Sequence, residues 1–383
     1  MKSKLLFITC HKLSGNNGGS NASKGFIYSF AKLFEDCSLI YPEIETPNLY
    51  IPKEYKLFPC RDPRTKFRKG FDMYLGVVNA LRNFVIHHLR SHSYDIIVVD
   101  HSVTGTGLAG VLKQSGAKII TIHHNVERDY LRDNGKERPV IFRYPYNYFA
   151  KKSEKNCLKL SSVNLTLTEK DAGIFRSWYP NINIHAYCLG ICEYRGILAK
   201  SFPLVKKNSN KFVITGSLCF IQSLKPILEF LEIYYPILKE ECPDCELVIA
   251  GRNPSSELID FCKNESNISL IPNPENIESL TQESNYYICP INAGSGIKLR
   301  VLDGLKQGLP ILCHEISSNG YEMLIEKGCM FSYSDTNTFR QALRHLLGAN
   351  LSKDYIYSIY ANSFSVDALT IKLNKILKSE KIL

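Results

Sequence analysis

Uninterrupted apolar runs constrain the fold of this chain more than any other feature of its sequence. Two of them, D-I-I-V-V-D at Asp95–Asp100 and K-I-I-T-I at Lys118–Ile122, are almost wholly β-branched. Strands with one face in water alternate apolar and polar residues, whereas strands of a parallel sheet covered on both faces do not. A short helix over Thr104–Gln114 fits between the two runs. The pattern therefore predicts an α/β fold built on a parallel sheet.

The same alternation continues along the rest of the chain. In the first half it predicts further strands at Lys4–Cys10, Ser162–Thr168 and Asn183–Gly190, and helices at Phe71–His92 and Val140–Leu160. In the second half it predicts strands at Phe212–Gly216, Leu247–Gly251, Ile268–Ile271, Tyr286–Ile291, Leu309–Cys313 and Met330–Tyr333. Helices are expected between and after them, at Pro226–Lys239, Ser255–Lys263, Ile277–Glu283, Lys298–Lys306, Tyr321–Glu326, Thr338–Leu347 and Val366–Ile382.

The length of 383 residues exceeds the size at which a single core stops growing, so two domains are expected. We expect a Rossmann-like domain over residues 1–190, a linker over 191–210, a second Rossmann-like domain over 211–365 and a final helix over 366–383.

A glycine turn lies between two of the predicted strands, in the stretch Cys289–Glu315. Gly294-Ser295-Gly296 provides a turn without Cβ crowding, where backbone N–H groups can approach an anion. Lys298 adds a positive charge in the first turn of the helix expected to follow, and Asp303 lies further along it. Taken alone, this unit also fits an ordinary connection between a strand and a helix. The residues by themselves leave both interpretations open.

The whole string G-S-G-I-K-L-R-V-L-D-G-L-K-Q-G-L-P-I-L resembles the donor-binding motif of GT-B glycosyltransferases of the family 4-like group. F-V-I-T-G-S-L, V-I-A-G-R-N-P and I-P-N-P resemble other landmarks of the same group. The resemblance implies two Rossmann-like domains facing across a cleft, with a C-terminal helix that crosses back to the first domain. It implies that the second domain binds a sugar nucleotide and the first an acceptor.

The resemblance also assigns roles to single residues. It implies that the donor diphosphate contacts Gly294, Ser295, Gly296, Ile297, Lys298, Gly216 and Ser217. Asp303 would bind the ribose hydroxyls. The match departs from the family pattern in three ways. Ser295 stands where many members have a glutamate, Asp303 is one methylene shorter than the usual glutamate, and no Arg/Lys pair follows Gly216. Lys298 and either Arg300 or Arg252 are then the cations left for phosphate.

Histidines follow the predicted strands of the first half. The string I-H-H-N-V-E resembles an H-N-x-E segment of the same glycosyltransferases, in which the histidine faces the donor sugar and its phosphates. By that match His124 is the candidate catalytic residue. His101 and Asn125 are candidates for the acceptor or phosphate loop, with Gly18 and Gly19 of the glycine-rich loop His11–Gly25. For His101 a role as a strand cap is as strong an interpretation, the glycines also fit a flexible surface loop, and Glu127 and Arg128 fit loop salt bridges.

The basic charge is concentrated in the first half, with a net charge of +12 over residues 1–200 and −2 over residues 201–383. Lys53–Lys69 holds seven basic residues before the helix expected at Phe71–His92. A solvated loop is one interpretation, and contact with an anionic membrane surface is the other. The resemblance implies a UDP- or GDP-linked sugar as donor and a saccharide or lipid-linked acceptor, with no nucleic-acid partner.

Composition adds further expectations. The 13 cysteines are scattered singly, and C-x-x-C at Cys242–Cys245 has no second ligand pair at zinc spacing, so we expect a reducing, cytoplasmic location and no metal site. No G-x-G-x-x-G follows a strand, which disfavours a nicotinamide enzyme. The resemblance implies a retaining, metal-independent transferase of cell-envelope polysaccharide assembly that needs no cofactor. A non-catalytic relative that binds a sugar nucleotide or a partner glycosyltransferase is the alternative.

Overall fold

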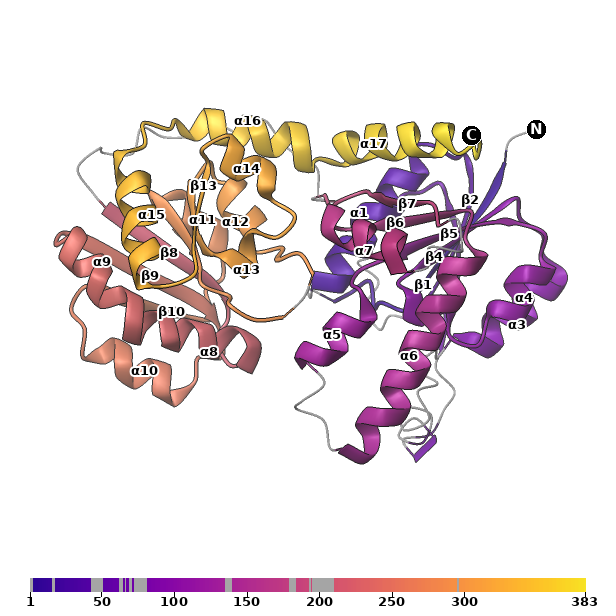
Figure 1. The fold of residues 1–383 in the computed structure, drawn as a ribbon, viewed down its shortest axis with the longest axis horizontal. Coiled ribbons are helices and arrows are strands. Elements are labelled where there is room, and N and C mark those ends of the chain that lie inside the picture. The colour runs from indigo at the N-terminus through magenta and orange to yellow at the C-terminus, as the bar shows by residue number, and fades with distance from the viewer. Residues whose placement is uncertain are drawn as a thin grey trace. The chain divides into compact units, whose positions relative to one another are not determined.

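The computed structural model describes residues 3–15, 18–42, 51–61, 65, 67–68, 71, 81–134, 140–178, 184–192, 194, 210–294 and 296–383. The chain divides into two compact units (Figure 1). Unit 1 comprises Met1–Gly196 and Ser363–Leu383, and unit 2 comprises Ile197–Asn362. The linker expected over residues 191–210 lies largely outside the described residues.

Unit 1 is built on a seven-stranded parallel sheet with the order β3-β2-β1-β4-β5-β6-β7. Its strands are β1 (Lys4–Thr9), β2 (Asp36–Pro42), β3 (Tyr55–Cys60), β4 (Ile96–Asp100), β5 (Lys118–His123), β6 (Val163–Thr166) and β7 (Ala186–Cys188). Its helices include α1 (Gly18–Ala31), α3 (Arg82–Ser91), the 3-10 helix η1 (Ser102–Gly105), α4 (Ala109–Gln114), α5 (Glu127–Asn134), α6 (Val140–Leu160), α7 (Glu169–Trp178) and α17 (Val366–Ser379).

Unit 2 repeats this architecture with a six-stranded parallel sheet of order β10-β9-β8-β11-β12-β13. The strands are β8 (Asn210–Ser217), β9 (Cys245–Arg252), β10 (Ile268–Pro272), β11 (Tyr286–Cys289), β12 (Ile311–His314) and β13 (Met330–Tyr333). The helices are α8 (Ile221–Glu229), the π-helix η3 (Phe230–Tyr234), α9 (Tyr235–Glu241), α10 (Ser256–Lys263), α11 (Ile277–Gln282), α12 (Val301–Leu305), α13 (Glu315–Ser318), α14 (Glu322–Glu326), α15 (Thr336–Gly348) and α16 (Lys353–Phe364).

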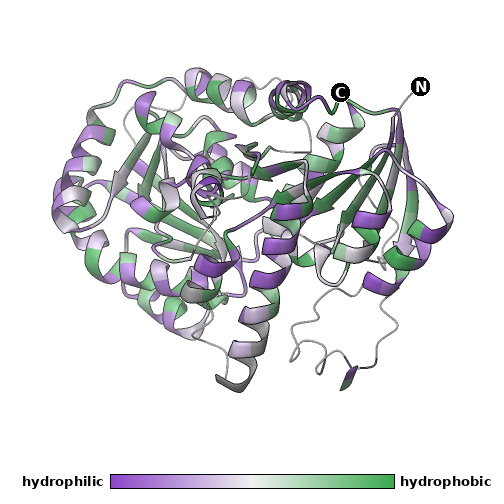
Figure 2. Cartoon of the chain, turned by 45° about the vertical axis from the view of Figure 1, so that its right-hand side comes forward, coloured by the Kyte–Doolittle hydropathy of each residue, from purple (hydrophilic) through white to green (hydrophobic). Residues whose placement is uncertain are grey.

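The central strands of both sheets are buried on both faces, as their uninterrupted apolar sequences predict. Every residue of β4 is buried, and so are all residues of β1 and β5 after the first lysine. Figure 2 shows these strands as the hydrophobic interior, with mixed hydrophilic and hydrophobic helices around them. Capping residues mark where helices begin. Thr168 accepts a hydrogen bond from the Asp171 N–H at 3.1 Å, as expected of the N-cap of α7.

Four local predictions are wrong in position or type. The basic stretch Lys53–Lys69 contains edge strand β3, in which Tyr55 and Cys60 are buried while Lys56 stays exposed. The helix expected at Thr104–Gln114 is split into η1 and α4. The helix expected at Pro226–Lys239 begins earlier, at Ile221, and contains a π-turn. The helix expected from Lys298 begins at Val301.

The end of the chain passes from unit 2 to unit 1, as the resemblance implies. Helix α16 is tied to unit 2 through the Lys353 ammonium, which donates to the carbonyls of Gln282 and Ser284 at 2.8 and 2.9 Å. Helix α17 then packs against α1 of unit 1, and Asp367 forms an ion pair with Lys32. Among the helices of the described residues, none is long and apolar enough to cross a membrane.

Close backbone packing between β8 and β9 gives a test of this fold. Gly251 lies opposite Gly216, and a Cβ added at Gly251 would lie 1.8 Å from the Gly216 carbonyl oxygen. Gly251→Ala should therefore destabilise the protein by about 1–3 kcal/mol, the usual range for overpacking. Gly348→Ala is the matched control, because no atom lies within 4 Å of its added Cβ. Urea unfolding that ranks the two variants equal would contradict this packing.

Candidate active site

Polar side chains of unit 1 meet where three neighbouring strands end. Thr9 ends β1, Asp100 ends β4 and His123 ends β5. The parallel register places Thr9 beside Asp100, and Asp100 beside Ile122 of β5. His124 follows directly after β5. Ligand sites of open parallel sheets lie outside the carboxyl ends of the strands, so this edge is the candidate site of unit 1.

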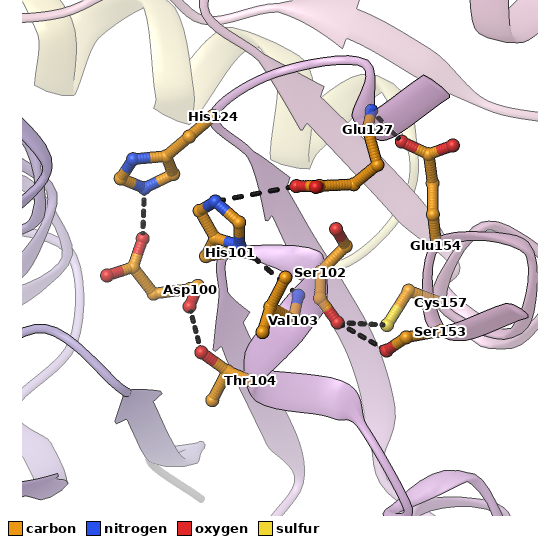
Figure 3. Close-up of polar contacts among 10 residues, drawn as sticks. All are labelled: Asp100, His101, Ser102, Val103, Thr104, His124, Glu127, Ser153, Glu154 and Cys157. Carbon is orange, nitrogen blue, oxygen red and sulfur yellow. Dashed lines mark hydrogen bonds and ion pairs between the residues drawn. The ribbon is translucent and has the colours of Figure 1, made fainter. Parts of the chain in front are cut away.

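Asp100 is the buried carboxylate at the centre of this edge. It accepts hydrogen bonds from Thr9 Oγ1 at 2.7 Å and from Ser23 Oγ of α1. A third comes from His124 Nε2 at 2.7 Å, as Figure 3 shows. Burial acts to raise the pKa of Asp100, but the charge and hydrogen bond of His124 outweigh burial and hold that pKa well below its usual range. Asp100 is therefore a carboxylate that orients the His124 ring.

Two more imidazoles surround His124. The His11 ring stacks on it with centroids 5.0 Å apart and planes 30° apart, and the His101 centroid lies 5.1 Å away. Burial and the neighbouring His124 lower the pKa of His11 to about 4, and the same causes lower that of His101 well below its usual range. His11 and His101 are therefore neutral at physiological pH. We call His11, Asp100, His101 and His124 the histidine cluster.

His101 is held in an unusual backbone conformation with φ 73° and ψ 130°. Such a conformation is strained for a residue with a Cβ and is found mostly at functional sites. Its Nδ1 accepts a hydrogen bond from the Val103 N–H at 3.2 Å, so the ring proton is assigned to Nε2. That nitrogen lies 3.5 Å from Glu127 Oε1, as Figure 3 shows. The protonated Nε2 of His101 thus faces Glu127 Oε1, a buried oxygen that accepts no hydrogen bond within the described part of the chain.

Glu127 is buried rather than part of an exposed loop salt bridge, which corrects the expectation from sequence. Its backbone N–H donates to Glu154 Oε2 of α6 at 2.6 Å. Burial raises the pKa of Glu127 to about 7 and that of Glu154 to about 8. Arg128 does lie in a surface ion pair, with Asp129. The histidine cluster is therefore flanked by two carboxyl groups that titrate near neutral pH.

The cluster also contains three side chains that metal ions prefer, since ligand atoms of His11, Asp100 and His124 lie within 4.8 Å of one another. Metal coordination uses lone pairs in the plane of the imidazole, and the rings of His11 and His124 are stacked rather than pointed at a common centre. Asp100 already accepts three hydrogen bonds. This geometry fits a hydrogen-bonded Asp–His pair better than a metal centre.

The remaining candidates of unit 1 lie beside the cluster. Gly18 and Gly19 are the first residues of α1, so the expected glycine loop is in part a helix. A Cβ at Gly19 would lie 2.5 Å from His11 Cε1, so the absence of a side chain there lets the His11 ring approach α1. Asn125 lies in the bend between β5 and α5 and is partly buried. Their roles toward a ligand stay predictions.

In unit 2 the glycine turn follows β11. Gly294 and Gly296 have φ values of 83° and 74°, a region that favours glycine. Ser295 lies outside the described residues. The Lys298 ammonium donates to the carbonyl oxygens of Gly294 at 2.8 Å and Gly296 at 3.4 Å, which ties it to the turn. Since α12 begins only at Val301 and has five residues, the charge here comes from side chains more than from a helix dipole.

The other candidates of unit 2 lie around the ends of β8 and β11. Gly216 and Ser217 are the last residues of β8, and Asp303 lies in the first turn of α12. Burial raises the pKa of Tyr287 on β11, and the charge of Asp303 raises it further. Asp303 therefore lies near Tyr287. The structure brings the glycine turn, Lys298 and Asp303 to one edge of the sheet, and their contacts with a donor stay predictions.

Asp100, His11 and Glu154 belong to this site but were not predicted from the sequence. Asp100 closes the apolar run D-I-I-V-V-D, and His11 follows the first strand, so a polar residue at a strand end was the available signal. Glu154 lies inside a long polar helix, and no pattern in the sequence marks it.

Comparison with known proteins agrees with the fold. Residues 209–349 match the family model for glycosyl transferases group 1. A protein described as an uncharacterized 44.6 kDa protein in the cps region of Klebsiella pneumoniae is 24% identical over 291 residues, which cover 70% of this chain and 71% of that protein.

Solved structures extend the similarity to both units. WaaG, a glycosyltransferase involved in lipopolysaccharide biosynthesis, aligns with a TM-score of 0.64 at 15% identity, over 98% of this chain and 99% of WaaG. Alr3699/HepE of Anabaena, solved in complex with UDP and glucose, aligns with a TM-score of 0.63 at 11% identity, over 98% of this chain and 100% of that one.

The buried carboxyl pair predicts how stability depends on pH. Glu154 is protonated in the folded protein up to about pH 8, whereas it ionises near its ordinary pKa of 4.5 when unfolded. The unfolded state then binds fewer protons, so stability falls as pH rises from about 4.5 to 8. Glu154→Gln keeps the acceptor for the Glu127 N–H and removes the titration. The melting temperature of Glu154→Gln minus that of wild type should therefore be larger at pH 8 than at pH 5 by at least about 3 °C.

The matched control is Glu257→Gln, which changes an exposed glutamate of α10. Differential scanning fluorimetry at both pH values gives the comparison. A difference between Glu154→Gln and wild type that stays constant with pH would show that Glu154 is ionised in the folded protein.

Proposed function

We propose that this chain is a group 1 glycosyltransferase of the GT-B fold and that it transfers a sugar from a nucleotide sugar to an acceptor hydroxyl with retention of anomeric configuration. The pathway is cell-envelope polysaccharide synthesis. Similarity to a protein of a cps region and to WaaG supports this assignment. The single observation that carries the proposal is the match over residues 209–349, which contain the glycine turn, Lys298 and Asp303.

The donor is a UDP- or GDP-linked sugar bound at the edge of the unit 2 sheet. Alr3699/HepE was solved with UDP and glucose, and the same fold supports the same class of donor here. Turn amides at Gly294, Gly296 and Ile297 and the Lys298 ammonium bind the diphosphate, with Gly216 and Ser217 beside them. Asp303 accepts hydrogen bonds from the ribose hydroxyls. Ser295 belongs to the same proposed turn by sequence alone.

His124 is the catalytic residue of unit 1. Its Nε2 proton is directed at Asp100, which leaves Nδ1 to face the ligand. A buried carboxylate that holds an imidazole in one orientation is a recurrent device of catalytic sites. His124 contacts the sugar and the donor phosphate. His101 and Asn125 bind the acceptor or the phosphates, with Gly18 and Gly19 behind His11.

The reaction needs no metal ion in this account, because Lys298 and the turn amides stabilise the departing diphosphate. The bond from the anomeric carbon to the donor phosphate breaks while the acceptor oxygen bonds to that carbon. The hydroxyl proton passes to the leaving diphosphate. Retention requires the acceptor to approach from the face that the diphosphate leaves. The stacked rings of His11 and His124 support a metal-free site in unit 1.

Product analysis tests this function. Mass spectrometry of reactions with a panel of UDP- and GDP-sugars and lipid-linked saccharides should show one hexosyl-type mass increment, and NMR should show that the anomeric configuration of the donor is kept. Chelation with EDTA should leave the rate unchanged. Asp100→Asn and His124→Ala should each lower kcat by about 10²–10⁴-fold, the range for a positioned catalytic imidazole.

His345→Ala is the control, because this histidine is exposed on α15. Circular dichroism should show that the Asp100→Asn variant is folded. If the protein binds a nucleotide sugar but forms no product, the result would support the alternative, a non-catalytic relative of the glycosyltransferases. A product of inverted configuration would overturn retention, and full activity of the His124 variant would remove its catalytic role.

We further propose that the protein binds an anionic membrane surface from the cytoplasmic side. Edge strand β3 and its surroundings present exposed Lys53, Lys56, Arg61 and Arg68, and Phe67 is 85% exposed. The other basic residues of Lys53–Lys69 lie outside the described residues. Each basic side chain near an anionic bilayer contributes about 1 kcal/mol, so four suffice for reversible attachment. Charged edge strands also prevent sheet aggregation, which is the simpler explanation to be tested.

Vesicle sedimentation separates the two explanations. Wild type should pellet with vesicles containing phosphatidylserine and not with neutral vesicles, and binding should fall as salt rises because the attraction is screened. Changing Lys53, Lys56, Arg61 and Arg68 to Gln should abolish pelleting. The control changes four exposed basic residues of unit 2, Lys225, Arg252, Lys263 and Lys327, in the same way. An equal loss of pelleting in both variants would mean that membrane binding depends on overall charge and not on the basic residues around β3.

A further inference from the structure

The guanidinium of Arg300 lies against the backbone of Gly216. A Cβ added at Gly216 would lie 2.2 Å from Arg300 Cζ and 2.3 and 2.5 Å from its two terminal nitrogens. Gly216 also has φ 149°, a conformation that L side chains rarely adopt. The Arg300 guanidinium therefore occupies the space that a side chain at Gly216, near the end of β8, would fill. We call this arrangement the Gly216 seat.

Side chains from three elements border the seat. A terminal nitrogen of Arg300 donates to Ser223 Oγ of α8 at 2.7 Å, and Ser223 is buried. Burial raises the pKa of Cys289 on β11, and the positive charges of Arg300 and Lys298 both act in the opposite direction. Both cations therefore lie near the end of β11. Arg300 is oriented toward the same edge of the sheet as the glycine turn.

Within the described part of the chain, no carboxylate lies within ion-pair distance of this arginine. Among the residues that the structure describes, Arg300 has no ion pair, whereas Arg340 and Arg344 of the same unit bond to Glu240 and Glu241. A guanidinium has five N–H donors, and Ser223 accepts from one. A partly buried charge is costly unless an anion pairs with it. The seat therefore fixes a cation that forms no ion pair with any described carboxylate.

We propose that Arg300, fixed by Gly216 and Ser223, binds the diphosphate of the nucleotide donor together with Lys298. The planar fork of a guanidinium bonds two phosphate oxygens at once, which a lysine ammonium does not. The role explains how β8 can end without an Arg/Lys pair, because the cation reaches Gly216 from the residue that precedes α12. This inference rests on the proposed donor site and deepens it.

Calorimetry with UDP, GDP and inorganic pyrophosphate tests the inference on the full-length protein. Arg300→Ala should raise the Kd of the better nucleotide and of pyrophosphate by about tenfold or more, as expected for a lost charge-assisted contact. Arg300→Lys should recover only part of this loss because the fork is gone. Ser223→Ala should weaken binding several-fold without a change of charge. In the Arg300→Ala background, Ser223→Ala should then have no further effect.

Lys327→Ala is the matched control, because Lys327 is an exposed cation of unit 2 that follows α14 and was never a candidate for the donor site. Melting temperatures show whether each variant is folded. An equal loss of affinity in Lys327→Ala, or unchanged affinity in folded Arg300→Ala, would overturn the inference while leaving the donor site intact. Absence of binding by wild type, or unchanged binding by Lys298→Ala, would instead overturn the proposed donor site.

Discussion

Parallel pairing of buried strands is the constraint on which both halves of this protein depend. It requires every strand of a unit to end at the same edge, so residues far apart in the sequence become neighbours there. In unit 1 the register places Thr9 beside Asp100, 91 positions later in the chain, and joins them by a hydrogen bond. In unit 2 it places Gly216 beside Gly251. The apolar residues of the strands form the core, and the polar residues at the strand ends form the candidate sites.

The two units use this edge in opposite electrostatic ways. Unit 1 buries one carboxylate, Asp100, whose hydrogen bond orients His124. Nearby lie His11 and His101, whose pKa values burial lowers. Unit 2 instead gathers two cations, Lys298 and Arg300, near the end of β11. An oriented imidazole suits contact with a sugar, and paired cations suit a diphosphate.

Much of the fold could be predicted because the strands carry their own signal. D-I-I-V-V-D and K-I-I-T-I are strands with nearly the expected ends, and Met330–Tyr333 matches the prediction to the residue. Strand β3 could not be predicted in this way, since it lies at the edge of the sheet and most of its residues, Lys56 among them, are not buried. Periodicity also placed the start of α12 too early. Leu299 and Leu302 keep a helical spacing, but the first turn has i to i−3 hydrogen bonds of the 3-10 type.

The site was harder to predict than the fold because its contacts are not local. Resemblance pointed to His124, but Asp100 becomes its partner only when β4 and β5 pair. Glu154 reaches Glu127 from α6, 27 residues away, and no spacing rule connects them. Arg300 was one of three possible cations in the sequence. We chose Arg300 because its guanidinium lies where a side chain at Gly216 would be. That contact is a property of packing and cannot be read from composition.

Hydrogen exchange of the full-length protein, with and without UDP or GDP, tests the central claim that the donor diphosphate binds at the edge of the unit 2 sheet. Backbone amides that bind an anion exchange more slowly, because opening must first release the ligand. The account predicts that protection concentrates in peptides covering Gly216–Ser217 and Gly294–Asp303. Protection confined to other peptides, with these two unchanged at saturating nucleotide, would contradict it.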